Sequence, residues 1–260
     1  MTDILSADGI NKYLKHSDVI NIEILDCVSS TNKLLKETAA QDNEGKVIIA
    51  LEQTAGRGRF LRKFYSPNGC GIYMSILLKP KISAHKAVLI TAAAAAAVAD
   101  SAEYLTEKKT GIKWVNDVLI DHKKVCGILT EGSVNTDTGD FNWAVLGIGI
   151  NAYMPDGGYP DDIKDIASAV FEKKEQDFKN RLAAQVLDRF WDYYLSLEEK
   201  TFLDSYKKRS FILGKPITVI KNENSTPAKA IDIDDNCRLL VEYQNGQREY
   251  LSSGEISIRI

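Results

Sequence analysis

Short apolar runs in the first half of the chain predict a β-sheet. Ile22 to Val28, Val47 to Leu51 and Gly71 to Leu78 have the length and composition of strands, and polar or glycine-rich turns separate them. Further strands are predicted at Ile112 to Trp114, Asp117 to Ile120, Lys124 to Thr130 and Trp143 to Ile150.

Three segments favour helices. Ser29 to Asn32 can cap a helix that begins near Lys33. Ser83 to Tyr104 predicts a long helix whose alanines at 92–97 allow close packing on a sheet. Phe178 to Lys208 has helical periodicity. One face of that helix carries Leu182, Val186, Phe190, Tyr193 and Leu197.

The pattern changes at Ile212, after which short strands alternate with turns. Asp234 to Asn236 and Asn245-Gly246 are hairpin signals. The predicted strands are Pro216 to Ile220, Ala228 to Ile233, Leu239 to Tyr243, Arg248 to Leu251 and Glu255 to Ile260. We therefore expect an α+β fold, with a mixed β-sheet domain flanked by helices at 1–211 (core 22–200) and a small β-barrel at 212–260.

The composition is that of an ordinary soluble globular protein, with 44% hydrophobic and 27% charged residues. A formal net charge of -3 argues against a protein that coats nucleic acid. The apolar run Ala87 to Ala99 is shorter than the ~18 residues of a membrane span, so we expect a buried helix there and no membrane partner.

The cysteines and the polar start of the chain favour the cytoplasm. Met1 to Ile10 has no secretory signal pattern. The cysteines are far apart and form no CxxC pair, so we expect buried, reduced thiols and neither disulfides nor a zinc site. They are Cys27, Cys70, Cys126 and Cys237. No histidine stands beside a serine or cysteine in an elbow motif, which leaves a histidine-dependent hydrolase without support.

The segment Gln53 to Arg62 carries the strongest chemical signal. Arginines 57, 59 and 62 are interleaved with Gly56 and Gly58 in a predicted flexible loop. Glycine permits close approach of the backbone to a ligand, and arginine is a forked donor for carboxylate and phosphate. The loop is thus suited to hold two anionic groups together, although a solvated surface turn is the simpler alternative. No complete GxGxxG or GxxxxGK[ST] motif is present.

Three more motifs have both a structural and a chemical interpretation. Lys113 to Asp117 followed by Lys123 to Leu129 predicts a hairpin whose lysine either faces water or neutralises a phosphate oxygen. The glycines in Gly147 to Asn151 indicate close approach by a ligand or another segment, or a bulge. Ser30 to Asn32 is unremarkable if it is only a helix cap.

In this order and spacing, the four motifs resemble those of the biotin protein ligases, from about Ile22 to Asn151. Leu213 to Pro216 and Ser253 to Arg259 resemble that family's SH3-like C-terminal domain. The resemblance implies that the chain makes biotinyl-5'-adenylate from biotin and Mg-ATP. It then implies transfer of biotin to one lysine of a biotin carboxyl carrier protein.

The resemblance also assigns residues. It implies catalytic roles for Lys124, Arg59, Arg62 and Asn116. It implies biotin contacts from Ser30, Thr31, Asn32, Gln53, Gly56, Arg57, Gly58, Arg59, Trp114, Lys124, Gly127 and Leu129. It implies ATP contacts from Arg59, Arg62, Phe64, Asn116, Asp117, Lys124 and Asn151. The metal ligands stay open, with Asn116 or Asp117 as candidates for magnesium.

Three positions depart from the family pattern. Leu61 occupies a position where the family often has a small residue such as glycine, Val115 replaces the family's usual proline, and Phe64 replaces a frequent tryptophan. A lipoate–protein ligase, or a biotin-binding regulator without turnover, is an alternative.

About twenty residues precede the first predicted strand, too few for a DNA-binding winged helix, so we expect no DNA partner. An exposed edge strand could pair with the carrier or with a second copy of the chain.

Overall fold

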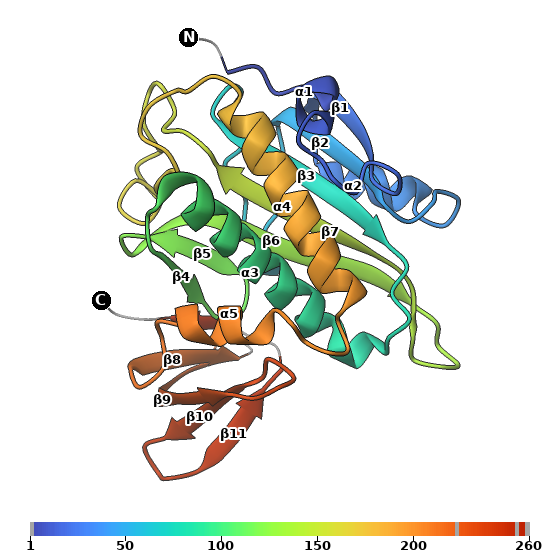
Figure 1. Ribbon diagram of the computed structural model, residues 1–260. Helices are drawn as coiled ribbons and strands as arrows, with labels where there is room; N and C mark the ends of the chain where they lie inside the picture. Colours follow the sequence, from blue (N-terminus) through green and yellow to red (C-terminus); the bar gives the residue numbers. More distant parts are fainter. Residues whose placement is uncertain (1–2, 222–223, 253–254, 258–260) are drawn as a thin grey trace.

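A seven-stranded mixed sheet forms the centre of the protein in the computed structural model, which describes residues 3–221, 224–252 and 255–257 (Figure 1). The strand order is β1-β2-β3-β7-β6-β5-β4, in which β1 and β2 are parallel and the other neighbours antiparallel. The strands are β1 Asn21–Val28, β2 Lys46–Gln53, β3 Gly71–Leu78, β4 Thr110–Lys113, β5 Asp117–Ile120, β6 Lys123–Val134 and β7 Phe141–Asn151. The predicted strands of this region are confirmed, with β6 extending further than its apolar run.

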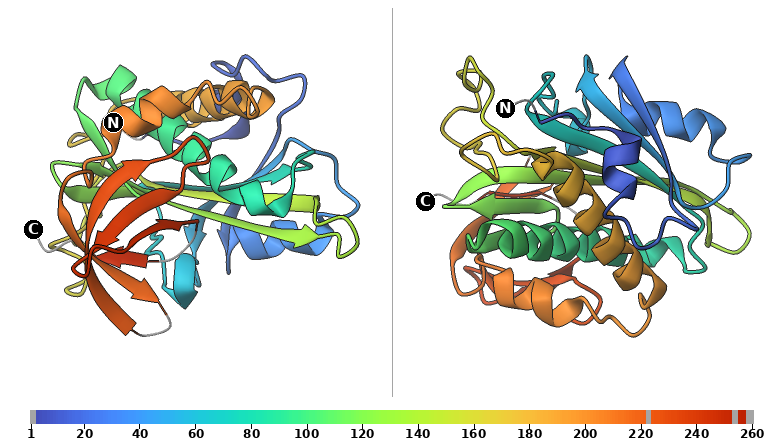
Figure 2. Two further views of the ribbon diagram at one scale, coloured as in Figure 1. Left: turned by 90° about the horizontal axis from the view of Figure 1, so that it is seen from below. Right: turned by 45° about the horizontal axis from the view of Figure 1, so that its top comes forward.

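Helices cover both faces of this sheet. α3 (Ala87–Thr106) and α4 (Phe178–Leu195) pack side by side on one face, whereas α2 (Thr31–Thr38) covers the other, as the left view of Figure 2 shows. The short α1 (Ala7–Asn11) contacts α4, and α5 (Leu203–Arg209) contacts α3. The 3₁₀ turns η1 (Arg59–Leu61) and η2 (Ala84–Lys86) complete the helical elements of the described residues.

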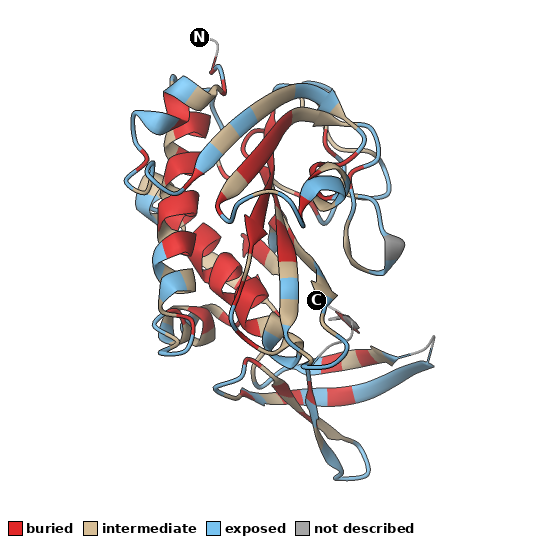
Figure 3. Ribbon diagram, turned by 90° about the vertical axis from the view of Figure 1, so that its right-hand side faces the viewer, coloured by how far each residue is buried: buried red, intermediate tan, exposed pale blue. Residues whose placement is uncertain are grey.

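The alanine-rich helix is the centre of the core. Alanines 92–97 of α3 have no exposed surface, because their small side chains let the helix lie close to the sheet (Figure 3). Ala84–Thr106 is long and apolar enough to cross a membrane, but 72% of its most apolar window is buried inside the protein. That burial is typical of a core helix, and the prediction of a buried helix is confirmed.

Two sequence predictions are wrong here. The helix expected over Phe178 to Lys208 is interrupted from Ser196 to Phe202, where Lys200 adopts a left-handed φ of 57°. Leu197 is buried in this turn, so the apolar period continues although the helix does not. Cys27 is exposed, because β1 is an edge strand, whereas the other three cysteines are buried; all four are free thiols.

A second, five-stranded sheet follows α5 and lies beyond the β4 end of the first sheet (Figure 1). Its antiparallel order is β11-β10-β9-β8-β12. The strands are β8 Pro216–Lys221, β9 Asn224–Ile233, β10 Leu239–Tyr243, β11 Arg248–Leu251 and β12 Glu255–Ser257. Within the described ranges β11 and β12 do not pair, so the sheet stays open there. Residues 253–254 and 258–260, into which the predicted last strand and the motif Ser253 to Arg259 extend, lie outside the described residues.

Candidate active site

The four sequence motifs meet around one cavity of about 390 Å³. The cavity lies over the glycine-containing parts of β6 and β7, below the arginine loop, and reaches the C-terminal sheet. Every residue assigned above lines it except Gly56. These residues are Ser30, Thr31, Asn32, Gln53, Arg57, Gly58, Arg59, Arg62, Phe64, Trp114, Asn116, Asp117, Lys124, Gly127, Leu129 and Asn151. The structure therefore brings together the assigned residues, and their roles remain predictions.

Uncharged polar groups form one end of the cavity. The Thr31 backbone N–H donates to Gln53 Oε1 at 2.9 Å, and Gln53 Nε2 donates to Ser66 Oγ at 3.0 Å. Ser30 caps α2 by accepting from Lys33 N, so the cap predicted from sequence also places Thr31 at the cavity. Buried amide and hydroxyl groups held in this way offer a fixed pattern of donors and acceptors to a neutral ligand.

Asn32 connects this end to β6. Its Nδ2 donates to Glu131 Oε2 at 3.0 Å and to Leu129 O at 3.3 Å, while its Oδ1 accepts from the fully buried Ser75 at 2.6 Å. A Cβ at Gly147 would lie 2.2 Å from Asn32 Oδ1, so only glycine leaves room for this amide. The prediction that another group lies close to the backbone at the Gly147 motif is confirmed, and that group is the Asn32 side chain.

Glu131 was not predicted, although it lies two positions after Leu129 and therefore on the same face of β6. Its Oε1 lies 2.6 Å from Lys36 Nζ and 3.8 Å from Arg57 Nη1. Burial opposes ionisation of this carboxyl, but the hydrogen bonds from Lys36 and Asn32 outweigh it, and the pKa of Glu131 lies below its usual value. Glu131 does not line the cavity itself, but it pairs with two residues that do, Asn32 and Arg57.

The arginine loop is folded on itself rather than extended. Phe64 N donates to Gly56 O at 2.9 Å and Gly58 N donates to Arg62 O at 2.7 Å, with η1 between them. A Cβ at Gly56 would lie 2.4 Å from Phe64 O, so Gly56 serves the closed base of the loop and not the cavity wall. The loop thereby places its three arginine side chains along one side of the cavity.

Asn116, directly before β5, and Asp117, the first residue of β5, hold cations from different parts of the chain. Arg59 Nη1 donates to Asn116 Oδ1 at 3.2 Å, and Lys124 Nζ lies 2.7 Å from Asp117 Oδ1. Lys124 sits at an irregularity in the β5–β6 pairing, of the kind that re-aims a side chain. Arg59 and Lys124 therefore face a common space, in which they can neutralise two anionic groups at once.

Phe64 lies on the glycines of the sheet. A Cβ at Gly149 would lie 2.5 Å from Phe64 Cε1, and Lys124 Nζ lies 6.0 Å from the ring centroid. Phe64 also makes an edge contact with Tyr73, which sequence reasoning missed and which lines the cavity from β3.

Two further segments of the wall were not predicted. The stretch after β7 contributes Tyr159, Ile163, Ile166 and Ala167, and it pairs with the backbone of Lys124 through Ile166 O and Ser168 N. Asn151 Nδ2 donates to Ser168 O at 3.0 Å, so the predicted Asn151 also anchors this stretch. Phe211 and Ile256 come from the C-terminal side, where Trp114 Nε1 donates to Cys237 O at 2.8 Å.

The described residues contain no group of three or more histidine, cysteine or acidic side chains that could hold a metal. Asp117 offers one carboxylate beside Asn116. That is compatible with a magnesium ion carried mainly by the phosphates of a nucleotide, since Mg²⁺ is usually bound by one or two carboxylates plus substrate phosphates.

The fold is that of a known class of enzymes. The model of the biotin/lipoate A/B protein ligase family matches residues 24–151, and that of the biotin protein ligase C-terminal domain matches residues 212–259. The biotin protein ligase of Aquifex aeolicus in complex with biotin and ATP superposes with a TM-score of 0.75 at 28% identity, over 92% of this chain and 98% of that one.

Relatives found by sequence similarity belong to the same class of enzymes. The bifunctional ligase/repressor BirA of Bacillus spizizenii is 34% identical over 96% of this chain and 75% of its own length. The biotin–[acetyl-CoA-carboxylase] ligase of Mycobacterium tuberculosis is 28% identical over 90% of this chain and 88% of its own length. The chain belongs to the biotin protein ligase family.

Proposed function

We propose that this protein ligates biotin to a lysine of a biotin carboxyl carrier protein, through biotinyl-5'-AMP. One observation carries the proposal: the cavity joins an end with the amide and hydroxyl groups of Thr31 and Gln53 to an end where the neighbours Asn116 and Asp117 hold Arg59 and Lys124. A ligand with a neutral hydrogen-bonding head, an apolar middle and a carboxylate tail fits such a cavity, and so does a polyphosphate beside that tail.

The polar end would take the ureido ring of biotin. Ser30, Thr31 and Gln53 supply donors and acceptors there, and Asn32 keeps its place through Glu131 and Ser75. Trp114, Gly127 and Leu129 also line the cavity, and they would contact the apolar part of the ligand. An apolar wall with a few placed polar groups is the usual form of a small-molecule site.

In the first step the biotin carboxylate attacks the α-phosphorus of ATP, an acyl–phosphate bond forms, and pyrophosphate leaves. Both reactants are anions, so the protein must hold them together and neutralise charge. Lys124 would bridge the carboxylate and the α-phosphate, with Arg57 and Arg59 on the carboxylate side and Arg62 toward the leaving phosphates. Asn116, Asp117, Phe64 and Asn151 would orient the nucleotide. Magnesium, held by the phosphates with Asp117 or Asn116, would supply further neutralisation.

In the second step a neutral lysine amine of the carrier attacks the mixed anhydride. An amide forms and AMP leaves. The carrier must therefore reach the acyl carbon between Arg57 and Lys124, which requires that the arginine loop leave one side of the cavity accessible.

We also propose the division of the chain into a catalytic domain at 1–211 and an SH3-like domain at 212–260. The separate five-stranded antiparallel sheet and the family-model match at 212–259 support this division. The need for ATP and the free cysteines are compatible with a cytoplasmic enzyme.

The test is incubation of the purified protein with Mg-ATP, biotin and a biotin carrier domain, followed by intact-mass measurement of the carrier. We expect the carrier to gain the mass of one biotinyl group, that is biotin minus one water, with one pyrophosphate released for each biotinyl group transferred. A parallel reaction with lipoate and a lipoyl carrier separates the two branches of the family. Modification with lipoate alone would reverse the substrate assignment, and no modification with either would overturn the proposal.

A further inference from the structure

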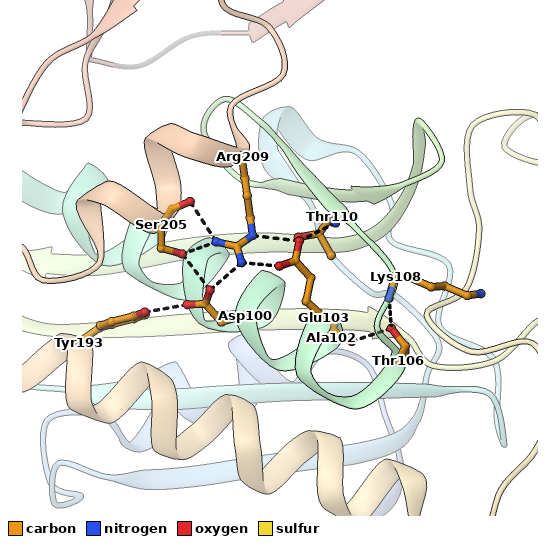
Figure 4. Close-up of polar contacts among 9 residues, drawn as sticks. All are labelled: Asp100, Ala102, Glu103, Thr106, Lys108, Thr110, Tyr193, Ser205 and Arg209. Carbon is orange, nitrogen blue, oxygen red and sulfur yellow. Dashed lines mark hydrogen bonds and ion pairs between the residues drawn. The ribbon is translucent and has the colours of Figure 1, made fainter.

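A half-buried ionic cluster outside the cavity joins α5 to α3. Arg209 donates from Nε and Nη2 to the carboxylate of Glu103, at 3.2 and 2.5 Å, and Nη2 lies 2.9 Å from Asp100 Oδ1 (Figure 4). The Arg209 side chain is only 15% exposed. Ion pairs that water partly reaches add little net stability, whereas the planar guanidinium of arginine permits few orientations of its hydrogen bonds. The cluster therefore suggests a geometric role.

The same carboxylates hold two more elements. Glu103 Oε1 accepts from Thr110 N and Oγ1 at 2.8 and 2.9 Å, which fixes the start of β4. Asp100 accepts from Ser205 of α5 and Tyr193 of α4 at 2.9 and 2.6 Å (Figure 4). We call Asp100, Glu103, Thr110, Tyr193, Ser205 and Arg209 the Arg209 cluster.

Two segments continue from the Arg209 cluster to the cavity: β4, which begins at Thr110, and the chain after Arg209. β4 runs from Thr110 to the turn that carries Asn116 and Asp117, the two residues that hold Arg59 and Lys124. Arg209 is followed by Ser210, which pairs with Ile112 of β4, and by Phe211, which lines the cavity.

Contacts continue along this junction. The buried Tyr206 of α5 donates to Val115 O at 3.2 Å, directly before Asn116. Phe211 packs over Gly111, where a Cβ would lie 3.3 Å from its Cδ1, and its ring lies 6.1 Å from that of His122. A shift of α5 along β4 would thus move the part of the cavity wall that Asn116, Asp117 and Phe211 form.

We infer that Arg209 is a positioning residue for the adenylation step: by fixing α5 against β4 it sets the place of Asn116, Asp117 and Phe211 at the nucleotide end of the cavity. The inference rests on the proposed function. Because β4 and β5 lie at the end of the sheet opposite β1 and β2, the ureido end formed by Thr31 and Gln53 is far less dependent on the cluster.

The test compares Arg209→Lys with Arg248→Lys, whose arginine pairs with Glu242 on the exposed surface of β11 and is 60% exposed. Both substitutions keep the positive charge and remove the planar guanidinium group. For Arg209→Lys we expect the KM for ATP in adenylate formation to rise about tenfold and that for biotin to rise less, since Arg59 and Lys124 also reach the biotin carboxylate whereas Thr31 and Gln53 are held elsewhere. Amide hydrogen exchange should accelerate in residues 110–117 and 210–214. Arg248→Lys should change none of these values.

Glu103→Gln provides a second variant if Arg209→Lys folds poorly, and assays at temperatures well below each variant's Tm separate positioning from loss of fold. A lowered Tm with both KM values and local exchange unchanged would overturn the inference, because the cluster would then only stabilise. An inactive wild type would instead overturn the proposed function, and the exchange measurement would still decide whether Arg209 fixes the two segments.

Discussion

Lys124 and Asp117 form an ion pair of 2.7 Å between the β6 lysine and the turn that leads into β5. Asn116, directly before Asp117, accepts from Arg59 and donates from Nδ2 to Ile128 O at 3.1 Å. One turn thus holds a cation from the loop and another from the sheet. The arrangement pre-organises positive charge before an anion arrives, and such donors contribute most when they need not move during the reaction.

Replacement of Lys124 by alanine removes the cation nearest to the proposed reacting atoms. We expect adenylate formation to slow by about 3–4 kcal/mol of transition-state stabilisation, the usual loss of one such donor. Biotin affinity should fall much less. Pyrophosphate release under single-turnover conditions measures the effect. Lys123→Ala is the matched control, since Lys123 is exposed on the same strand and does not line the cavity; equal losses in both variants would refute the assigned role.

Ser75→Ala should weaken biotin binding although Ser75 does not line the cavity. Ser75 is fully buried, and its Oγ lies 2.6 Å from Asn32 Oδ1 and 2.7 Å from Thr31 Oγ1. Loss of the hydroxyl leaves a buried acceptor without its donor, at a cost of about 1–3 kcal/mol, and frees Asn32 to reorient. We expect a lower Tm and a larger dissociation constant for biotin by calorimetry.

The control for that experiment is Ser101→Ala in α3. Ser101 is equally buried, but its Oγ has no hydrogen-bond partner among the residues that the structure describes. Its replacement should be neutral or slightly stabilising. A loss of biotin affinity in Ser101→Ala, or none in Ser75→Ala, would contradict the role of Ser75 as the donor to Asn32.

Gly149→Ala should displace Phe64 from the sheet. The added Cβ would lie 2.5 Å from Phe64 Cε1, closer than carbon atoms approach, and the ring is confined by Tyr73 and Gly127. Because Phe64 is proposed to contact the nucleotide, we expect a higher KM for ATP with little change in fold by circular dichroism. Gly157→Ala is the control, since no atom lies within 4 Å of its added Cβ. An unchanged KM for ATP in Gly149→Ala would refute the proposal that Phe64 contacts the nucleotide.

The sequence predicted the elements of this fold well where the signal was local. Strands such as Gly71–Leu78 and Leu239–Tyr243 were predicted to the residue, because apolar runs between turns depend on nearby positions only. The break at Ser196 was missed, since Leu197 continues the apolar period through a turn. Phe211 and Ile166 reach the cavity through tertiary pairing with β4 and Lys124, for which the sequence has no periodic signal.

The carboxyl of Glu131, which binds Lys36 and the cavity residue Asn32, makes a pH-dependent contribution to the stability of the protein. Its pKa is lowered in the folded protein because Lys36 and Asn32 overcome the effect of burial. A lowered folded pKa means that the stabilisation is fully present above the unfolded value of about 4.3 and is lost as the pH falls through the folded pKa. Glu131→Gln should therefore lower Tm at pH 7, and the difference from wild type should shrink below about pH 4.

Thermal unfolding from pH 7 to pH 3 measures that difference directly. Glu172→Gln is the matched control, because Glu172 also pairs with a lysine, Lys108 at 2.9 Å, but is 81% exposed. Water screens such a pair, so its loss should change Tm little at any pH. A difference in Tm between wild type and Glu131→Gln that stays constant from pH 7 to pH 3 would mean that the glutamine disturbs packing and that the charge of Glu131 does not stabilise the protein. A difference that closes as the pH falls ties the stability of the protein to the ionised carboxylate that binds Lys36 and Asn32.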